Sequence, residues 1–338
     1  MAFSRAPYAR ELIFPCSLCA GTLAVALAMC IALGIRGAAI MTEYCSVSLF
    51  VGPLSLYLWL MIGARKAEFR KSVHRQVADM LRERWLVLLL PMVIFPVFMT
   101  AFTTLKCAFP LVTGYRWDST LAAVDMTIFG EDPWRITHAL IGPAGTWVIS
   151  MAYTAVWGIA LGIGVPLYSL YAPPRDVIRA FSALMLTWLV VGVVGAALLS
   201  SAGPVFAGAV DPTLAEHFKP LHQALAQSFG PADPVTLAQA YLARDLLQPL
   251  TVKGGGVSAM PSMHLGVCTF LVLLAGKTHW RWPAVALTAI IWVGSVHFGY
   301  HYAVDGLVAV PLAMLCWWWV HRHQSAPAPV GARLLAAA

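Results

Sequence analysis

Eight apolar runs divide the chain, and they lie at about residues 16–35, 46–62, 85–104, 144–171, 180–201, 262–276, 283–298 and 304–320. The longer runs reach the roughly 20 residues that an α-helix needs to cross the hydrocarbon core of a bilayer. We therefore predict an all-α, polytopic membrane protein with about eight transmembrane helices. The first run follows Arg5 and Arg10 but has no clean small-residue cleavage site near Gly34, so we expect an anchor that is not cleaved.

The composition agrees with this pattern. Of the 338 residues, 60% are hydrophobic and 11% are charged, whereas soluble domains carry about 25% charged residues. The sequence contains no Rossmann or P-loop glycine pattern, no internal repeat and no soluble domain. The chain is therefore interpreted as one membrane domain.

The distribution of basic residues predicts the topology. Eight spans place both termini on one side. With the N-terminus inside, 15 of the 22 lysines and arginines lie in the inside segments, although the outside segments are longer. The positive-inside rule then makes both termini cytoplasmic. The net charge of +7 reflects this topology, so we expect no nucleic-acid partner and a location in the plasma (inner) membrane.

Two outside segments are long enough to form structure of their own. In residues 105–143 the apolar side chains Leu121, Val124, Ile128 and Phe129 recur near helical spacing. This spacing predicts an amphipathic helix at the interface, with tryptophans at headgroup depth. Residues 202–260 contain several prolines and predict a compact outside cap of short helices.

A first polar motif, residues 254–264, stands at the mouth of the sixth apolar run. Pro261 and Ser262 predict the start of a helix, whose unpaired N–H groups and dipole favour an anion. The glycines at 254–256 allow the backbone to approach a bulky anionic group closely. The Ser262 hydroxyl adds a donor, and His264 adds a group that titrates near neutral pH.

A second polar motif, residues 297–305, precedes the last run. His301 and Asp305 are four residues apart and are expected on one face of a helix. The carboxylate can keep one imidazole nitrogen protonated and leave the other free as a nucleophile. The predicted topology places both motifs in the same outer layer, where His264 can give a proton to the leaving oxygen. An anion cradle, a nucleophile and an acid together favour phosphoryl transfer.

These residues resemble a known family. Pro261-Ser262-Met263-His264 is similar to the second signature, Pro-Ser-x-His, of the type-2 phosphatidic acid phosphatase superfamily, and His301-x-x-x-Asp305 is similar to the end of its third signature. That family has a six-helix core. The resemblance implies a catalytic membrane core at 85–320, two extra N-terminal helices with a basic cytoplasmic connection at 1–84, and a short cytoplasmic tail at 321–338. It also implies a phosphohistidine intermediate at His301, oriented by Asp305, with His264 protonating the leaving alcohol.

The chain departs from the family pattern at two basic positions. The first signature, Lys-x6-Arg-Pro, is absent, and residues 200–204 stand in its place; the Ser-Arg that opens the third signature aligns with Gly294-Ser295. This pattern and the stretch 118–134 are more similar to the inositol phosphorylceramide synthase-like branch, in which the acceptor is a hydroxyl. We expect Lys253, beside the glycines, to replace a missing cation, and Arg244 after it. The alternative for either residue is a headgroup contact.

Competing interpretations concern the same histidines. His297 is expected to be interfacial, or to support His301 from one helical turn away. Zinc could bind His264, His297, His301 and Asp305, but the His-Glu-x-x-His pattern is missing. A membrane transporter or channel could use the polar cluster as a substrate path, but the cluster lies at one face rather than the midplane. Two glycine pairs, Gly158/Gly162 and Gly192/Gly195, are interpreted as close helix contacts.

The sequence therefore predicts a metal-independent and cofactor-independent lipid phosphatase or phosphotransferase whose site is extracytoplasmic. Its expected partners are a lipid phosphate in the membrane and either water or a hydroxyl acceptor. The expected catalytic residues are His264, His301 and Asp305, and the expected phosphate-binding residues are Ser262, Lys253, Arg244 and Gly256.

Overall fold

The computed structural model describes residues 10–34, 73–247 and 256–324, together with a few isolated residues between 8 and 58. The described residues form helices and the turns between them, and no strand occurs among them. The all-α prediction is therefore confirmed. The predicted span at 46–62 lies largely outside the described residues, and Lys253 lies outside them entirely.

Within the described ranges, five helical segments are long and apolar enough to cross a membrane, and they are Ile13–Leu33 (α1), Ala78–Thr113, Pro143–Tyr171, Pro174–Leu198 and Val304–His323 (α18). Two shorter helices, α16 (Met263–Ala275) and α17 (Arg281–His297), coincide with the two short predicted runs. These segments establish a multi-pass membrane protein. The number of eight spans stays a prediction.

The three middle segments consist of α-helices joined by π-helical turns. Their parts are α4 (Val73–Leu89), η2 (Leu90–Ile94) and α5 (Phe95–Thr113); α8 (Pro143–Met151), η3 (Ala152–Val156), α9 (Trp157–Ile159), η4 (Ala160–Gly164) and α10 (Val165–Tyr171); and α11 (Pro174–Leu189), η5 (Val190–Gly195) and α12 (Ala196–Leu198). Pro91 lies inside η2, where it removes a backbone donor. Such turns are frequent at functional sites, and η3 carries Tyr153, a residue of the candidate site.

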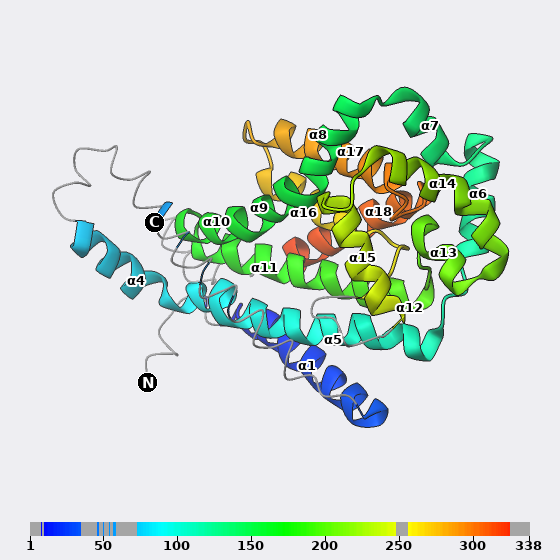
Figure 1. Ribbon diagram of the computed structural model, residues 1–338. Helices are drawn as coiled ribbons and strands as arrows, with labels where there is room; N and C mark the ends of the chain where they lie inside the picture. Colours follow the sequence, from blue (N-terminus) through cyan, green and yellow to red (C-terminus); the bar gives the residue numbers. More distant parts are fainter. Residues whose placement is uncertain are drawn as a thin grey trace.

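The bundle is organised around α16, which packs against α11, α17 and α18, while α1 runs along α5 (Figure 1). Two glycines of η5 permit the close approach of α16. A Cβ atom on Gly192 would lie 2.8 Å from the Met263 sulfur, and one on Gly195 would lie 2.8 Å from Pro261 Cδ. The close-contact interpretation is confirmed for this pair. For Gly158 and Gly162 no described residue lies within 4 Å of an added Cβ atom, so the interpretation stays a prediction for that pair.

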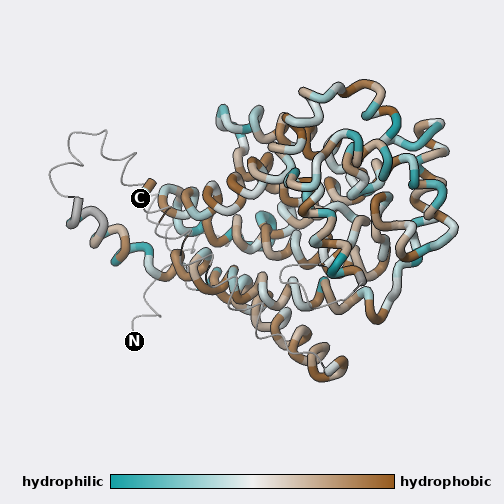
Figure 2. Tube along the Cα trace, in the orientation of Figure 1, coloured by the Kyte–Doolittle hydropathy of each residue, from teal (hydrophilic) through white to brown (hydrophobic). Residues whose placement is uncertain are grey.

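Short helices from the two predicted outside segments form a cap at one end of the bundle. Residues 105–143 supply α6 (Asp118–Phe129) and α7 (Pro133–Leu140), and the predicted cap segment 202–260 supplies α13 (Pro204–Val210), η6 (Pro212–Leu214), α14 (Ala215–Ser228) and α15 (Pro234–Leu247). In Figure 1, α6, α7, α13 and α14 lie at the right-hand end, and Figure 2 shows hydrophilic residues gathered there. The membrane-crossing helices are mainly hydrophobic in the same view.

The orientation of α6 differs from a simple amphipathic helix. Its buried face consists of Asp118, Leu121, Ala122 and Asp125, whereas Val124, Ile128 and Phe129 are exposed. The helix thus turns two carboxylates toward the protein interior. Buried carboxylates require hydrogen-bond donors, and α6 finds them in the loops that carry the candidate site.

Candidate active site

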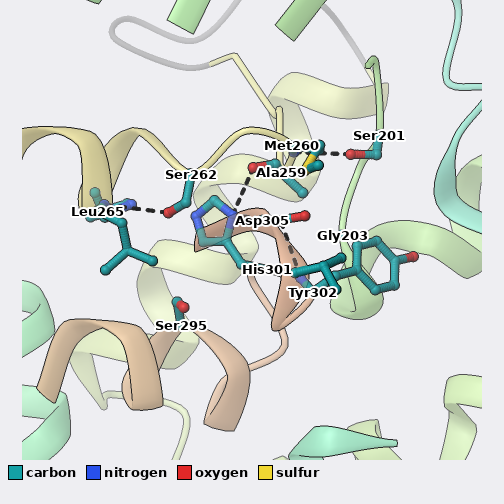
Figure 3. A network of polar contacts seen from close by, with 12 residues as sticks. Ser201, Gly203, Ala259, Met260, Ser262, Leu265, Ser295, His301, Tyr302 and Asp305 are labelled. Carbon is teal, nitrogen blue, oxygen red and sulfur yellow. Dashed lines mark hydrogen bonds and ion pairs between the residues drawn. The ribbon is translucent and has the colours of Figure 1, made fainter. Parts of the chain in front are cut away.

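His301 lies in the turn before α18 rather than on a helix, because α18 begins at Val304. The four-residue spacing still brings it to Asp305, in the first turn of α18. His301 Nδ1 lies 3.0 Å from Asp305 Oδ2 and 2.8 Å from the Ala259 carbonyl oxygen (Figure 3). Both partners accept hydrogen bonds, so Nδ1 carries the proton and Nε2 keeps a free lone pair. Both side chains are buried, Asp305 completely.

His264 lies in the first turn of α16. Ser262 caps this helix, since its Oγ accepts the N–H of Leu265 at 3.4 Å. The His264 ring lies between Tyr153 and Trp157, with centroid distances of 4.6 and 4.8 Å. Its Nδ1 is 3.2 Å from the Tyr153 hydroxyl. When that hydroxyl donates to Nδ1, Nε2 carries the ring proton.

The two histidines lie near one another. Their ring centroids are 5.8 Å apart, and the angle between the ring planes is 75°. Figure 3 shows the Ser262 side chain beside the His301 imidazole. The Ser262 hydroxyl accepts from Leu265 and keeps its own proton for donation. Two stretches about forty residues apart in sequence thus meet, as the sequence predicts.

The expected phosphate-binding residues are only partly brought together. Gly256 has a φ of +96°, and its N–H donates to the Asp245 carboxylate rather than remaining free for an anion. Arg244 lies on α15 and is exposed. Lys253 and the glycines at 254–255 fall outside the described residues. Ser262 is the expected phosphate ligand that the structure places beside His301.

His297 is fully buried rather than interfacial. Its Nδ1 is 3.1 Å from Thr137 Oγ1, its Nε2 is 3.0 Å from Thr146 Oγ1, and its ring stacks on His138 at 4.0 Å. It therefore joins α17 to α7 and α8. Both ring nitrogens are engaged, so His297 supports the bundle and does not contact His301. In the part of the chain that is described, no three His, Cys, Asp or Glu side chains cluster as metal ligands would.

Asp118 of α6 is a positioning residue that sequence reasoning missed. Its carboxylate accepts the N–H groups of Ala202 at 2.8 Å and Gly203 at 2.9 Å, and the Tyr302 hydroxyl at 3.0 Å. Burial raises the pKa of Asp118, and the two N–H groups oppose this shift. Burial and the neighbouring Asp118 raise the pKa of Tyr302 above its ordinary value. Tyr302 therefore stays protonated and ties the residue after His301 to α6.

The segment 200–203 stands where the family's first signature is absent, and it holds the site through its backbone. Ser201 accepts the N–H of Ala259 on its carbonyl at 2.8 Å and the N–H of Met260 on its hydroxyl at 3.0 Å (Figure 3). Gly203 has a φ of +90°, and a Cβ atom there would collide with the Tyr300 carbonyl oxygen. Residues 200–203 thus position the loop that supplies the Ala259 acceptor to His301.

Asp125, seven residues after Asp118, caps α18. Its carboxylate accepts the N–H groups of Ala303 at 2.7 Å and Val304 at 3.2 Å. The seven-residue spacing of the two aspartates on the helical face of Leu121 is the signal that sequence reasoning could have used. One short helix therefore holds both the 202–203 loop and the start of α18.

Titration of Asp125 should be visible in stability. Burial raises the pKa of Asp125 from 3.8 to about 6, against the N–H groups of Ala303 and Val304. At a pH between these two pKa values, the folded protein therefore carries a proton on Asp125 that the unfolded chain does not carry. This contribution to the free energy of unfolding is fully present below the unfolded pKa and is lost as pH rises through the folded one.

The test compares the melting temperatures of wild type and Asp125→Asn in detergent from about pH 7 to about pH 4. Asparagine does not titrate, and all other groups are common to both proteins. We expect the wild type to gain stability relative to the variant as the pH falls. A relative loss would mean that the folded carboxyl has a depressed pKa.

The structure thus combines an all-helical membrane bundle with a buried His301–Asp305 pair and, near that pair, a second histidine, His264. Residues 121–319, from α6 to α18, match the family model of the PAP2 superfamily, and the chain belongs to this superfamily. No curated protein and no solved structure matches the chain. Membership indicates a phosphatase or phosphotransferase that acts on phosphate esters.

Proposed function

We propose that this protein transfers a phosphoryl or phosphodiester group from a membrane lipid phosphate through a phosphohistidine intermediate at His301. The observation that carries the proposal is the pair of acceptors on His301 Nδ1, the Ala259 carbonyl and the Asp305 carboxylate. They leave Nε2 as the nucleophilic nitrogen, and the His264 ring lies nearby, with its centroid 5.8 Å from that of His301.

In the first step, the Nε2 lone pair of His301 attacks phosphorus, and the bond to the lipid oxygen breaks. The leaving oxygen takes the proton of His264, so that the lipid departs as an alcohol. The phosphorylated imidazole is positively charged, and the Asp305 carboxylate stabilises it. In the second step, water or an alcohol attacks phosphorus, His264 takes back a proton and the P–N bond breaks.

The lipid substrate follows from the position of the site. His264 and His301 lie at the ends of apolar helices, α16 and α18, so an amphiphile can present its phosphate from the membrane surface. The positive-inside distribution supports a site outside the cytoplasm, and we propose the plasma (inner) membrane as its location. The core at 85–320 would carry the reaction, with a hydroxyl acceptor as in the inositol phosphorylceramide synthase-like branch, or with water.

The test is an assay of purified protein in detergent with excess EDTA. Phosphatidic acid and isoprenyl diphosphate are offered with water as acceptor, and phosphatidylinositol is offered with a lipid alcohol. We expect either inorganic phosphate or a headgroup transferred to the alcohol, at rates that EDTA leaves unchanged. Phosphate release identifies a phosphatase, and transfer identifies a phosphotransferase. If EDTA abolished activity and zinc restored it, the metal-independent mechanism would be overturned. If no substrate were converted, the proposal of a lipid phosphate substrate would be overturned.

A further inference from the structure

Lys106 is a basic residue inside a membrane-crossing segment. It lies on α5, seven residues before the helix ends at Thr113, between the buried residues Leu105 and Cys107. An ionisable side chain within such a segment is costly and is usually retained for function.

The stem of Lys106 packs against the loop that leads into the first motif. A Cβ atom on Gly256 would lie 2.9 Å from Lys106 Cγ and 3.2 Å from its Cδ. The absence of a side chain at Gly256 therefore makes room for the lysine rather than for an anion. This contact fixes the direction of the lysine stem relative to the loop at 256–262.

A buried carboxylate accompanies the lysine. Asp245 of α15 is 3% exposed, accepts the N–H of Gly256, and lies near enough to Lys106 for the two charges to attract each other. Lys106, Asp245 and Gly256 therefore form one unit that joins α5, α15 and the loop before α16. Among the described residues, this unit places a cation against the loop of the first motif. Of the two expected basic residues, Arg244 is exposed, and Lys253 lies outside the described residues.

The face of α5 that carries Lys106 also approaches the proton donor. Phe102, one helical turn before Lys106, and Met263, the residue before His264, both border Gly192, where an added Cβ atom would lie 2.8 Å from each of them. The charges of Lys106 and His264 are close enough to interact. Two cationic groups that approach each other repel, whereas an anion bound between them attracts both. A phosphate that touches His301 from the opposite side would fill this place. The ammonium group then neutralises charge that develops on the phosphoryl oxygens as the lipid oxygen leaves.

We propose that Lys106, held by Asp245 and Gly256, is the phosphate-binding cation of this site and binds the phosphoryl oxygens on the leaving-group side. This inference rests on the proposed function, because it assigns the ligand of the same site. It takes the role that sequence reasoning gave to Lys253 and Arg244. The alternative is a structural ion pair between Lys106 and Asp245, with no contact to the substrate.

Binding of inorganic phosphate or orthovanadate, measured as a rise in melting temperature, tests the inference without turnover. We expect Lys106→Met to weaken this binding by about 10- to 100-fold, as loss of a charge-assisted hydrogen bond does, and to raise KM for the lipid phosphate. Lys219→Met is the matched control, because Lys219 is exposed on α14 and paired with Glu216. It should bind phosphate like wild type.

The double variant Lys106→Met/Asp245→Asn separates the two roles. Removal of both partners of a structural ion pair should restore stability and phosphate binding together. If Lys106 binds phosphate, the double variant should recover stability while its affinity for phosphate stays low. Equal phosphate affinity in Lys106→Met and wild type would overturn the inference. A wild type that neither binds phosphate nor turns over lipid phosphates would instead overturn the proposed function.

Discussion

His301→Asn will abolish turnover, with a loss of at least about 10³-fold. The asparagine amide can still donate to the Ala259 carbonyl and to Asp305, which now bind Nδ1, so the turn before α18 keeps its shape. The variant lacks only the nitrogen that attacks phosphorus. The measurement is single-turnover loss of a ³²P-labelled lipid phosphate, together with the acid-labile, base-stable phosphoenzyme expected of wild type.

The matched control for this variant is its melting temperature, which should stay close to that of wild type because both Nδ1 hydrogen bonds are replaced. Turnover by His301→Asn within tenfold of wild type would remove His301 as the nucleophile. A phosphoenzyme that persists in the variant would point to another nucleophile, and its position could be mapped by digestion.

His264→Ala will slow the first step by an amount that depends on the leaving group. For a lipid alcohol, loss of the general acid should cost about 10²- to 10⁴-fold. For an aryl phosphate with an acidic phenol, the phenolate leaves without a proton, and the loss should be smaller by at least tenfold. The measurement is the rate of alcohol or phenol release before the first turnover is complete.

A comparison within one variant guards against indirect effects. Tyr153 and Trp157 enclose the His264 ring, and their collapse into the space left by alanine would slow both substrates equally. Equal losses on the alkyl and aryl substrates would therefore show that His264 does not act as the acid. His264→Gln, which fills more of the space, should show the same dependence on the leaving group.

Much of the fold and of the candidate site could be predicted because it depends on residues that are close together in the sequence. The helix start at Ser262 depends on the N–H three residues later, and the His301–Asp305 contact spans four residues. Apolar length located each described span, with ends that differ from the prediction by up to nine residues. The meeting of the two motifs followed from topology, because helix ends on one side of a membrane share a layer.

The features that the sequence did not predict depend on contacts between residues that are far apart in the chain. Asp118 binds Ala202 and Gly203 more than eighty residues away, and Asp125 binds Ala303 across a still longer separation. Spacing cannot show which backbone groups a carboxylate will meet. The same holds for glycine pairs, since Gly192 contacts Met263 whereas no described residue lies close to Gly158. Lys106 falls within the predicted outside segment 105–143, whereas in the structure it lies on α5, which extends to Thr113.

The attachment of two loops to α6 has a consequence for how the protein responds to its bilayer. Membrane helices tilt to match hydrocarbon thickness, and such tilting would ordinarily shift the ends of α12 and α18 relative to each other. Here Asp118 holds the loop after α12 and Asp125 holds the first turn of α18, both from one rigid twelve-residue helix. We therefore expect a change in lipid chain length to shift the opposite ends of these helices and to leave the spacing around His301 unchanged.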